Sequence, residues 1–362
     1  MAWDALLSGT AWFLAVVHIG LWGVLAGNLW YLRRYRRRAS LDTPPSLSVL
    51  IPARNEAHNL ARLLPSLLAQ EHPDFEVVVY DDGSDDGTWE VLQAVDDPRL
   101  TAVRGSGPPS GWVGKVHALY QATRHASGAQ YLFLDADAAL NDAGALHRLA
   151  ERFAALPRGS VLTGLTRLRG YAALLVSMVP NAILIGLPWP LVERAASTTL
   201  SALNGQCWMI EAHAYHEHEP HKALPNEVLE DVMIGRYLKR QGLLPVLVDV
   251  QQDVSIHMYD TLPAAWRGFR KNAYLILGGT PVSFVGLFLY FMLVFVLAPL
   301  TTPWFLLSIY GLKAATDRIS GFPWWVTALA PLSYLLSSAL QLDSALSHWA
   351  GRVDWKGRRV GA

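Results

Sequence analysis

A nearly charge-free apolar run over residues 11–32 constrains this chain more than any other feature of its sequence. A helix of about 20 apolar residues is long enough to cross a bilayer. Five arginines follow the run at once: Arg33, Arg34, Arg36, Arg37 and Arg38. Because basic residues beside a membrane helix favour the cytoplasmic side, we expect residues 1–34 to form an N-terminal transmembrane anchor with a basic flank.

Other interpretations of this segment fit the residues less well. A cleaved signal peptide carries its positive charge before the apolar run, whereas only Asp4 precedes this one. A buried helix of a globular core is the structural alternative. The arginines could bind nucleic acid, but beside a membrane helix they favour anionic lipid headgroups. We therefore expect an uncleaved anchor and no nucleic-acid partner.

A second apolar region follows the middle of the chain. Residues 281–312 and 322–342 contain no charged side chain. The whole chain is only 17% charged, against about 25% in ordinary soluble domains. We expect C-terminal transmembrane segments over residues 275–346 and a basic tail over residues 347–362, which prefers the cytoplasm. The number of C-terminal spans stays open, and one of them could be re-entrant.

The middle of the chain, residues 45–274, has the mixed composition of a globular domain. Residues 47–52 and 75–80 are short β-branched runs typical of buried strands, and residues 57–70 between them have apolar positions at helical spacing. Alternating strands and helices predict an α/β domain with a mostly parallel sheet. Cys207 is the only cysteine, which excludes an intrachain disulfide and a cysteine zinc cluster.

Acidic side chains follow three of the predicted strands. Asp135 and Asp137 end one apolar run, Asp82 follows another, and Glu56 comes just after the first. The carboxyl ends of parallel strands share one edge of a sheet, where ligands bind in open α/β domains. Two carboxylates at that edge suit a hard divalent cation held together with substrate phosphates. The alternative, that each acid only shapes a turn, fits one strand end better than three.

Five segments in this order resemble the inverting family-2 glycosyltransferases, which have a GT-A fold: SVLIPARNEAHNL, VVVYDDGSDDGT, GWVGKVHAL, FLDADA and LPNEVLEDVMIGRYLKRQG. The resemblance covers residues 48–272. It implies a GT-A domain, which is Rossmann-like with a mostly parallel sheet, here flanked by transmembrane helices. The flanking apolar segments resemble the branch that acts on lipids, including carotenoid- and hopanoid-associated glycosyltransferases.

The resemblance implies roles for four donor-binding side chains. Ala53 and Glu56 would line the nucleotide pocket, Asp82 would bind the nucleobase, and Lys115 would lie near the nucleotide and its phosphates. The implied donor is a nucleotide sugar, most often a UDP-sugar.

The resemblance also implies a divalent cation, Mg²⁺ or Mn²⁺, and a general base. Asp135 would contact the ribose or the cation, Asp137 would ligate the cation, and Asp231, beside Glu230, would be the base. The chemistry agrees, because a leaving diphosphate gains charge and an acceptor hydroxyl needs a base in reach. Alternatively, Glu230 and Asp231 only complement a helix dipole. We expect that helix to pack through Val232, Met233, Tyr237 and Leu238.

Arg270 and Lys271 come before the second apolar region, and two roles are open for them. They could steady the diphosphate, or they could anchor the chain at the membrane interface beside Trp266. The Q-x-x-R-W motif of many polysaccharide-extending relatives is missing from the sequence, which argues against processive synthesis. His257 could complete a metal shell, although a lone histidine is more often structural. The histidines of residues 213–221 fit no usual zinc spacing, so we expect a solvated loop there.

Residues 171–192 are apolar and nearly long enough to cross a membrane. A single crossing here would put Asp137 and Asp231 on opposite sides, and three prolines interrupt a regular helix. We therefore expect an interfacial element that guides an apolar acceptor to the site. The alternative is a buried core segment.

Together these features predict a metal-dependent glycosyltransferase of the cell membrane, multi-pass, with its catalytic domain in the cytoplasm. The expected reaction moves a sugar, glucose from UDP-glucose by family habit, to a hydroxyl of a lipid such as a carotenoid or a glycolipid. The alternative enzymatic activity is transfer to a polyprenyl phosphate or a short saccharide. A non-catalytic membrane scaffold is the other alternative.

Overall fold

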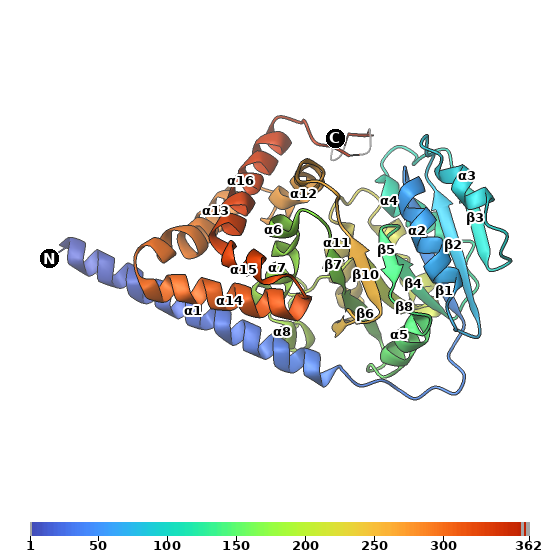
Figure 1. Cartoon of the computed structure of the whole chain (residues 1–362), viewed down its shortest axis with the longest axis horizontal. Coiled ribbons are helices and arrows are strands. Elements are labelled where there is room, and N and C mark those ends of the chain that lie inside the picture. Colours follow the sequence, from blue (N-terminus) through green and yellow to red (C-terminus); the bar gives the residue numbers. More distant parts are fainter. Residues whose placement is uncertain (1, 356–357, 360–362) are drawn as a thin grey trace.

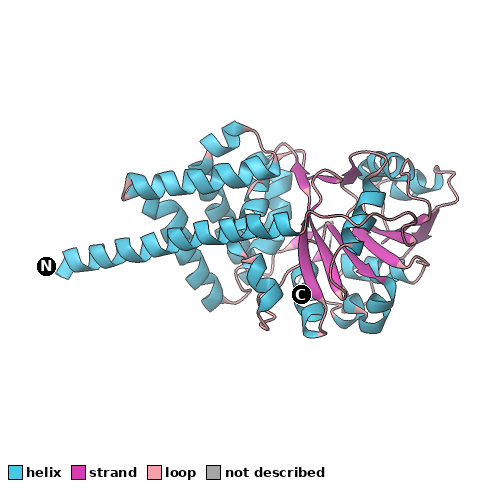
Figure 2. Ribbon diagram, turned by 90° about the horizontal axis from the view of Figure 1, so that it is seen from below, coloured by secondary structure: helices cyan, strands magenta, loops and turns pink. Residues whose placement is uncertain are grey.

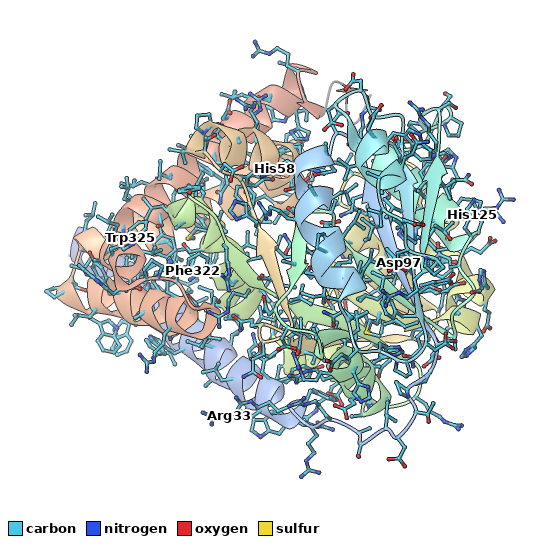
Figure 3. All side chains as sticks on the ribbon, turned by 45° about the vertical axis from the view of Figure 1, so that its right-hand side comes forward. Arg33, His58, Asp97, His125, Phe322 and Trp325 are labelled. Carbon is cyan, nitrogen blue, oxygen red and sulfur yellow. The ribbon has the colours of Figure 1, made fainter. Side chains whose placement is uncertain are left out.

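A computed structural model of the chain describes residues 2–355 and 358–359 and divides into a sheet-containing part and a helical part (Figure 1). Figure 2 shows the strands gathered on one side and the long helices on the other. The longest helix, α1 (Ala2–Arg34), runs along the helical part, and its N-terminal end projects beyond the other helices. In Figure 3, Trp325 lies on the helical side of the molecule and His125 lies on the opposite side.

Seven strands of the described chain form the main sheet. In spatial order they are β3 (Leu100–Arg104), β2 (Phe75–Asp81), β1 (Leu47–Ala53), β4 (Gln130–Leu134), β8 (Cys207–Glu211), β6 (Ser160–Leu165) and β9 (Leu244–Asp249). Parallel pairs join β3 to β2, β2 to β1, β1 to β4 and β6 to β9, whereas β8 is antiparallel to β4 and β6. The prediction of a mostly parallel α/β sheet is confirmed.

Helices cover both faces of this sheet, which is why its central strands are apolar almost throughout. The helix α2 (Ala57–Leu68) packs four buried leucines on one face, and α4 (Gly114–Thr123) packs Ala118, Leu119 and Ala122 on the other. The register places Ala53 at the end of β1 opposite Asp81 at the end of β2. The residues that follow these two strands therefore leave the sheet at the same edge.

A smaller sheet, in the order β5 (Ala138–Leu140), β10 (Val254–His257) and β7 (Arg167–Arg169), extends the domain. Asp253, which is buried just before β10, accepts hydrogen bonds from Nε of Arg148 at 2.5 Å and from Nε of Arg152 at 3.1 Å. Both arginines belong to α5 (Ala145–Ala154), so this ion-pair cluster fixes the smaller sheet against that helix. The remaining elements of this part are α3 (Thr88–Gln93), α9 (Ala212–His218), α10 (Pro220–Ala223), α11 (Glu230–Arg240) and the short pair β11 (Asp354–Trp355) and β12 (Arg358–Arg359).

The helical part contains α1 and the apolar segments that follow the sheets. These are α6 (Ala173–Val176), α7 (Met178–Gly186), α8 (Trp189–Arg194), α12 (Leu262–Ile276), α13 (Pro281–Phe291), η1 (Met292–Leu297), η2 (Ala298–Leu300), α14 (Pro303–Ser320), α15 (Trp324–Ala328) and α16 (Ala330–Trp349). Among the described residues, two helices are long and apolar enough to cross a membrane, Gly9–Arg34 and Pro281–Leu300. The apolar run over residues 322–342 is divided between α15 and α16.

Large apolar side chains lie on the outside of the helical part. Trp12 is 75% exposed, Val282 is 85% exposed and Leu300 is 80% exposed. Exposed apolar surface of this kind is typical of a contact with a membrane or another protein. The arrangement agrees with the expected flanking membrane helices, whose number and orientation stay predictions.

Two charged residues of α14 are buried and pair with each other, Lys313 and Asp317. Nζ of Lys313 also donates to Oγ of Ser177 at 3.0 Å, and Oγ1 of Thr327 donates to Oδ2 of Asp317 at 2.7 Å. Buried charges are tolerated when they are paired and hydrogen-bonded. The pair therefore joins α14 to the segment around Ser177 and to α15.

Residues 171–192 form the three short helices α6, α7 and α8 rather than one span. Nδ2 of Asn28, on α1, donates to the carbonyl oxygens of Leu184 and Leu187, both at 2.9 Å. The segment thus packs inside the helical part, and its depth in a bilayer stays a prediction. The basic tail expected over residues 347–362 lies partly outside the described residues.

Candidate active site

A cavity of about 1550 Å³ lies where the carboxyl ends of β1, β2 and β4 meet α11 and α12. All but one of the side chains predicted to form the site line this cavity: Ala53, Glu56, Asp82, Lys115, Asp135, Asp137, Glu230, Asp231 and Lys271. The exception is Arg270. The structure therefore brings together acidic residues that lie almost 180 positions apart in the sequence.

The turn after β4 aims two carboxylates at the cavity. The amide of Asp135 donates to the carbonyl oxygen of Gln206 at 3.2 Å, and the amide of Ala138 donates back to the carbonyl of Asp135 at 3.1 Å. The amide of His257 donates to the carbonyl oxygen of Asp137 at 2.9 Å. These bonds involve only the main chain, and both residues line the cavity at the end of the buried strand.

Lys115 is the central cation of the site. It lies in the first turn of α4, with Nζ 2.8 Å from Oδ1 of Asp135 and 3.0 Å from Oε1 of Glu230. Burial lowers the pKa of Lys115, but the charges of Asp135 and Glu230 outweigh burial and raise it well above its ordinary value. The pKa of Glu230 is lowered, because Lys115 and Lys271 together outweigh its burial. Lys115 therefore stays charged and links the end of β4 to the start of α11.

Asp231 is held in the first turn of α11, as predicted for a carboxylate at a helix start. The amide of Gly205 donates to Oδ2 at 3.2 Å and the amide of Val232 donates to Oδ1 at 2.8 Å. Burial, followed by the charge of Glu230, raises the pKa of Asp231 to about 6. A carboxylate with that pKa is ionised at neutral pH and basic enough to take a proton.

The face on which α11 packs differs from the prediction. The helix buries Ile234, Gly235 and Leu238, whereas Val232, Met233 and Tyr237 are only partly buried. Of the four residues expected to pack, only Leu238 is fully buried. The buried face of the helix is therefore rotated around the helix axis relative to the predicted one. Asp231 still reaches the cavity because it lies in the first turn, before the buried stripe begins.

The side chains that could bind a cation are two carboxylates of one loop. Among the described residues, no group of three or more His, Cys, Asp or Glu is arranged to hold a metal ion. Mg²⁺ is commonly bound through one or two carboxylates, with substrate phosphates and water completing the shell. Asp135 and Asp137 fit that kind of site, in which the diphosphate of the donor brings the remaining oxygen ligands.

The end of the cavity near Asp82 contains groups that the sequence did not single out. Nη1 of Arg54 donates to the carbonyl oxygen of Asp82 at 3.0 Å. The ring of Trp112 stacks on Tyr120, with centroids 5.4 Å apart, and meets His117 edge-on. Nδ1 of His117 lies 3.8 Å from Oδ1 of Asp82. Trp112 belongs to the GWVGK segment, three residues before Lys115. Its closeness to Lys115 in the sequence could have identified it as a site residue.

Tyr259 is a second residue that the sequence did not reveal. It lines the cavity with a φ of 53°, a left-handed conformation that is uncommon for a bulky residue. Burial, followed by the charges of Asp137 and Asp135, raises the pKa of its phenol. The phenol therefore stays protonated near the acidic loop.

Arg270 and Lys271, predicted as a pair, separate in the structure. Lys271 lines the cavity, and the charge of Glu230 only partly offsets the burial that lowers its pKa. Arg270 turns the other way, with Nη1 3.8 Å from Oδ2 of Asp343, an oxygen that also accepts a hydrogen bond from Nε1 of Trp266. This position beside Trp266 matches the second of the two roles left open for Arg270, and its role in donor binding stays a prediction. Successive helix positions point about 100° apart, so neighbours seldom face the same cavity.

The histidine-rich segment is helical, and the expectation of a solvated loop there is wrong. Its histidines lie on α9 and α10, and His221 is fully buried with Nδ1 2.8 Å from the hydroxyl of Tyr215. The hydroxyl of Tyr131 lies 2.7 Å from Nε2 of His216. His257 lines the cavity and pairs with Asp260 at 2.6 Å. Burial raises the pKa of Cys207 to about 12, which agrees with a packing role.

Part of the chain matches a known protein family. Residues 48–170 match the model of the family described as Glycosyl transferase family 2. Over these residues the chain is similar to the family-2 glycosyltransferases. The matched region ends at residue 170, just before α6, so the helical part lies outside the match.

Several curated relatives of the chain have the same name. The chain is 27% identical over 247 residues to a 4,4'-diaponeurosporenoate glycosyltransferase of Staphylococcus haemolyticus, a match covering 66% of this chain and 64% of that protein. A Staphylococcus aureus protein of the same name is 35% identical over 113 residues, covering 31% of this chain and 29% of its own. The matched region thus spans less than two thirds of each relative.

The fold of the whole chain has a solved counterpart. A mannosyltransferase from Pyrobaculum calidifontis, PcManGT, solved in complex with GDP-Man and Mn²⁺, superposes with a TM-score of 0.53 at 19% identity. The superposition covers 97% of this chain and 99% of that one. At this identity the likeness establishes the GT-A fold, and the predicted fold class is confirmed.

Proposed function

We propose that this protein is a membrane-bound, inverting glycosyltransferase that moves a sugar from a nucleotide diphosphate to a hydroxyl of a lipid. The observation that carries the proposal is the convergence of Asp82, Asp137 and Asp231 on one cavity, with Lys115 at its centre. The family-2 domain and the names of the relatives support the same reaction class. The arginines after α1 support a cytoplasmic position for the cavity.

The proposed chemistry follows from the positions of the side chains. The carboxylate of Asp231 takes the proton of the acceptor hydroxyl while the acceptor oxygen bonds to the anomeric carbon. The bond from that carbon to the β-phosphate oxygen breaks, and the diphosphate leaves with the electron pair. Attack on the face opposite the leaving group inverts the configuration. Lys115 and Lys271 place positive charge beside the leaving group.

Asp135 and Asp137 are the residues proposed to hold a divalent cation. When bound, Mg²⁺ or Mn²⁺ would supply charge neutralisation for the departing diphosphate. Asp82, with Arg54 and Trp112 beside it, is proposed to bind the nucleobase. UDP-glucose is the donor proposed first, and the GDP-Man bound by PcManGT makes GDP-mannose the donor to test beside it.

The acceptor proposed is a carotenoid or a related apolar lipid. The names of the relatives support a carotenoid-type acceptor, and the exposed apolar helices support one that resides in a membrane. Transfer to a polyprenyl phosphate is the alternative, which the product decides.

The test uses the full-length protein in lipid nanodiscs, with UDP-glucose or GDP-mannose, Mn²⁺ and a mixed pool of carotenoid alcohols and polyprenyl phosphates. Mass spectrometry identifies the glycosylated product. Wild-type protein and the control Asp85→Asn, an exposed carboxylate in the loop after β2, are expected to form a glycolipid, and Asp231→Asn is not. Donor binding without turnover in all three would favour the scaffold alternative. Equal turnover in all three would remove Asp231 from the mechanism.

A further inference from the structure

The cavity extends well beyond the room that a nucleotide sugar needs. Its volume of about 1550 Å³ exceeds the roughly 300–1,000 Å³ of ordinary small-molecule sites. Besides its charged residues, the cavity is lined by many apolar side chains, and most of these come from helices of the helical part. One continuous space therefore joins the acidic cluster to the apolar helices.

One wall of this apolar arm is a single face of α1. Val17, Gly20, Leu21 and Val24 line it. The spacing of three, four and seven residues places these four side chains on one stripe of the helix. The N-terminal anchor is thus part of the cavity as well as a candidate membrane span.

The facing walls come from α7 and α13. On α7 most residues line the cavity: Met178, Val179, Asn181, Ala182, Ile183, Ile185 and Gly186. On α13 the lining residues are Leu287, Tyr290 and Phe291, whose spacing follows one side of the helix. Three helices therefore contribute apolar side chains to one arm.

The arm reaches the outer surface of the helical part. Leu287 is 44% exposed and Tyr290 is 38% exposed, and both line the cavity. Both helices that are long and apolar enough to cross a membrane, within the described residues, contribute to these walls. An arm with this lining offers an apolar chain the same surroundings as a bilayer, without exposure to water.

We infer that the arm between α1, α7 and α13 holds the apolar chain of the acceptor, which enters sideways from the membrane and presents its hydroxyl to Asp231. The inference rests on the proposed function and adds the route by which the acceptor enters and the helices that bind its chain. A long, flexible or polyene chain fits this geometry. A soluble saccharide would leave the apolar arm unfilled, so the site selects lipids by their chains.

Two glycines of α1 provide a matched test. A Cβ atom placed at Gly20 or at Gly23 meets no atom within 4 Å, and only Gly20 lines the cavity. Leucine is a better helix former than glycine, and the Cβ atom has open space at both positions. Gly20→Leu therefore fills the arm from the α1 side, and Gly23→Leu makes the same chemical change outside it. Gly186→Leu fills the arm from the α7 side, where a Cβ also has open space.

The assay compares a long acceptor, zeaxanthin, with cyclohexanol, which carries a ring hydroxyl without the chain, and with water as measured by donor hydrolysis. Full-length variants are used in nanodiscs. We expect Gly20→Leu and Gly186→Leu to lower kcat/KM for zeaxanthin by about tenfold or more, the effect of a lost fit in an apolar pocket. Cyclohexanol transfer and donor hydrolysis should stay within about twofold of wild type, and Gly23→Leu should match wild type throughout.

Two results would overturn the inference. One is an unchanged rate with zeaxanthin in both filled-arm variants, and the other is an equal loss in Gly23→Leu. A loss of donor hydrolysis together with zeaxanthin transfer would place the damage in the donor site and also count against the arm. A wild-type protein that hydrolyses and transfers no donor at all would instead refute the proposed function, so the two failures are distinct.

Discussion

The pH dependence of transfer tests the role of Asp231 most directly. Its pKa rises from the ordinary 3.8 to about 6, with burial as the larger cause and the charge of Glu230 as the second. That rise means that ionising Asp231 costs about 3 kcal/mol more free energy here than in water. Because the base must be ionised to take a proton, activity should be present above pH 6 and lost as the pH falls through it. About nine tenths of the base is ionised at pH 7 and about one tenth at pH 5.

The assay is kcat/KM for lipid glycosylation between pH 5 and pH 8 at constant ionic strength. Asp231→Asn should lower it by about 10² to 10⁴-fold, the usual contribution of a general base. Glu230→Gln removes a charge that raises the pKa of Asp231, so the acid limb should move to lower pH. The reasoning fails if wild type shows no acid limb near pH 6, or if Glu230→Gln moves the limb upward. Asp85→Asn, outside the cavity, should keep the wild-type profile.

Three further outcomes follow from contacts described above. Asp137→Ala should abolish Mn²⁺-dependent binding of the donor nucleotide in calorimetry, while Asp85→Asn keeps it. Trp112→Ala removes an aromatic side chain near Asp82. It should raise KM for the donor about tenfold or more with little change in kcat, since base stacking is worth about 1–3 kcal/mol. An unchanged KM would show that Trp112 does not bind the donor. Asp253→Asn leaves Arg148 and Arg152 without their shared carboxylate, so it should cost about 3–5 kcal/mol of unfolding free energy, measured as a lower Tm; an unchanged Tm would contradict this.

The edge of the sheet at which the site forms was predictable from sequence, because it depends only on strand direction. Parallel strands place their carboxyl ends together, so Glu56, Asp82 and Asp137 had to emerge near one another once their strands were recognised. Asp231 was found differently, through its position at a helix start within a segment that resembles the family. Both signals are local in the chain and survive small errors in element boundaries.

Rotation about a helix axis was not predictable in the same way. Arg270 and Lys271 are adjacent, yet only one faces the cavity, and the partner that decides this, Asp343, lies more than 70 residues away. The buried face of α11 was misjudged for the same reason, because partly apolar side chains lie on several of its sides. The walls formed by α1 and α7 likewise depend on which helices pack together, which hydropathy alone does not determine.

The position of Lys115 has a consequence for assembly of the protein. Its ammonium offsets part of the charge of two carboxylates, one from the end of β4 and one from the start of α11. Under the proposed mechanism, the domain should fold without a metal ion, and the divalent ion should bind together with each nucleotide. A chelator should therefore abolish the activity of the protein without changing its Tm.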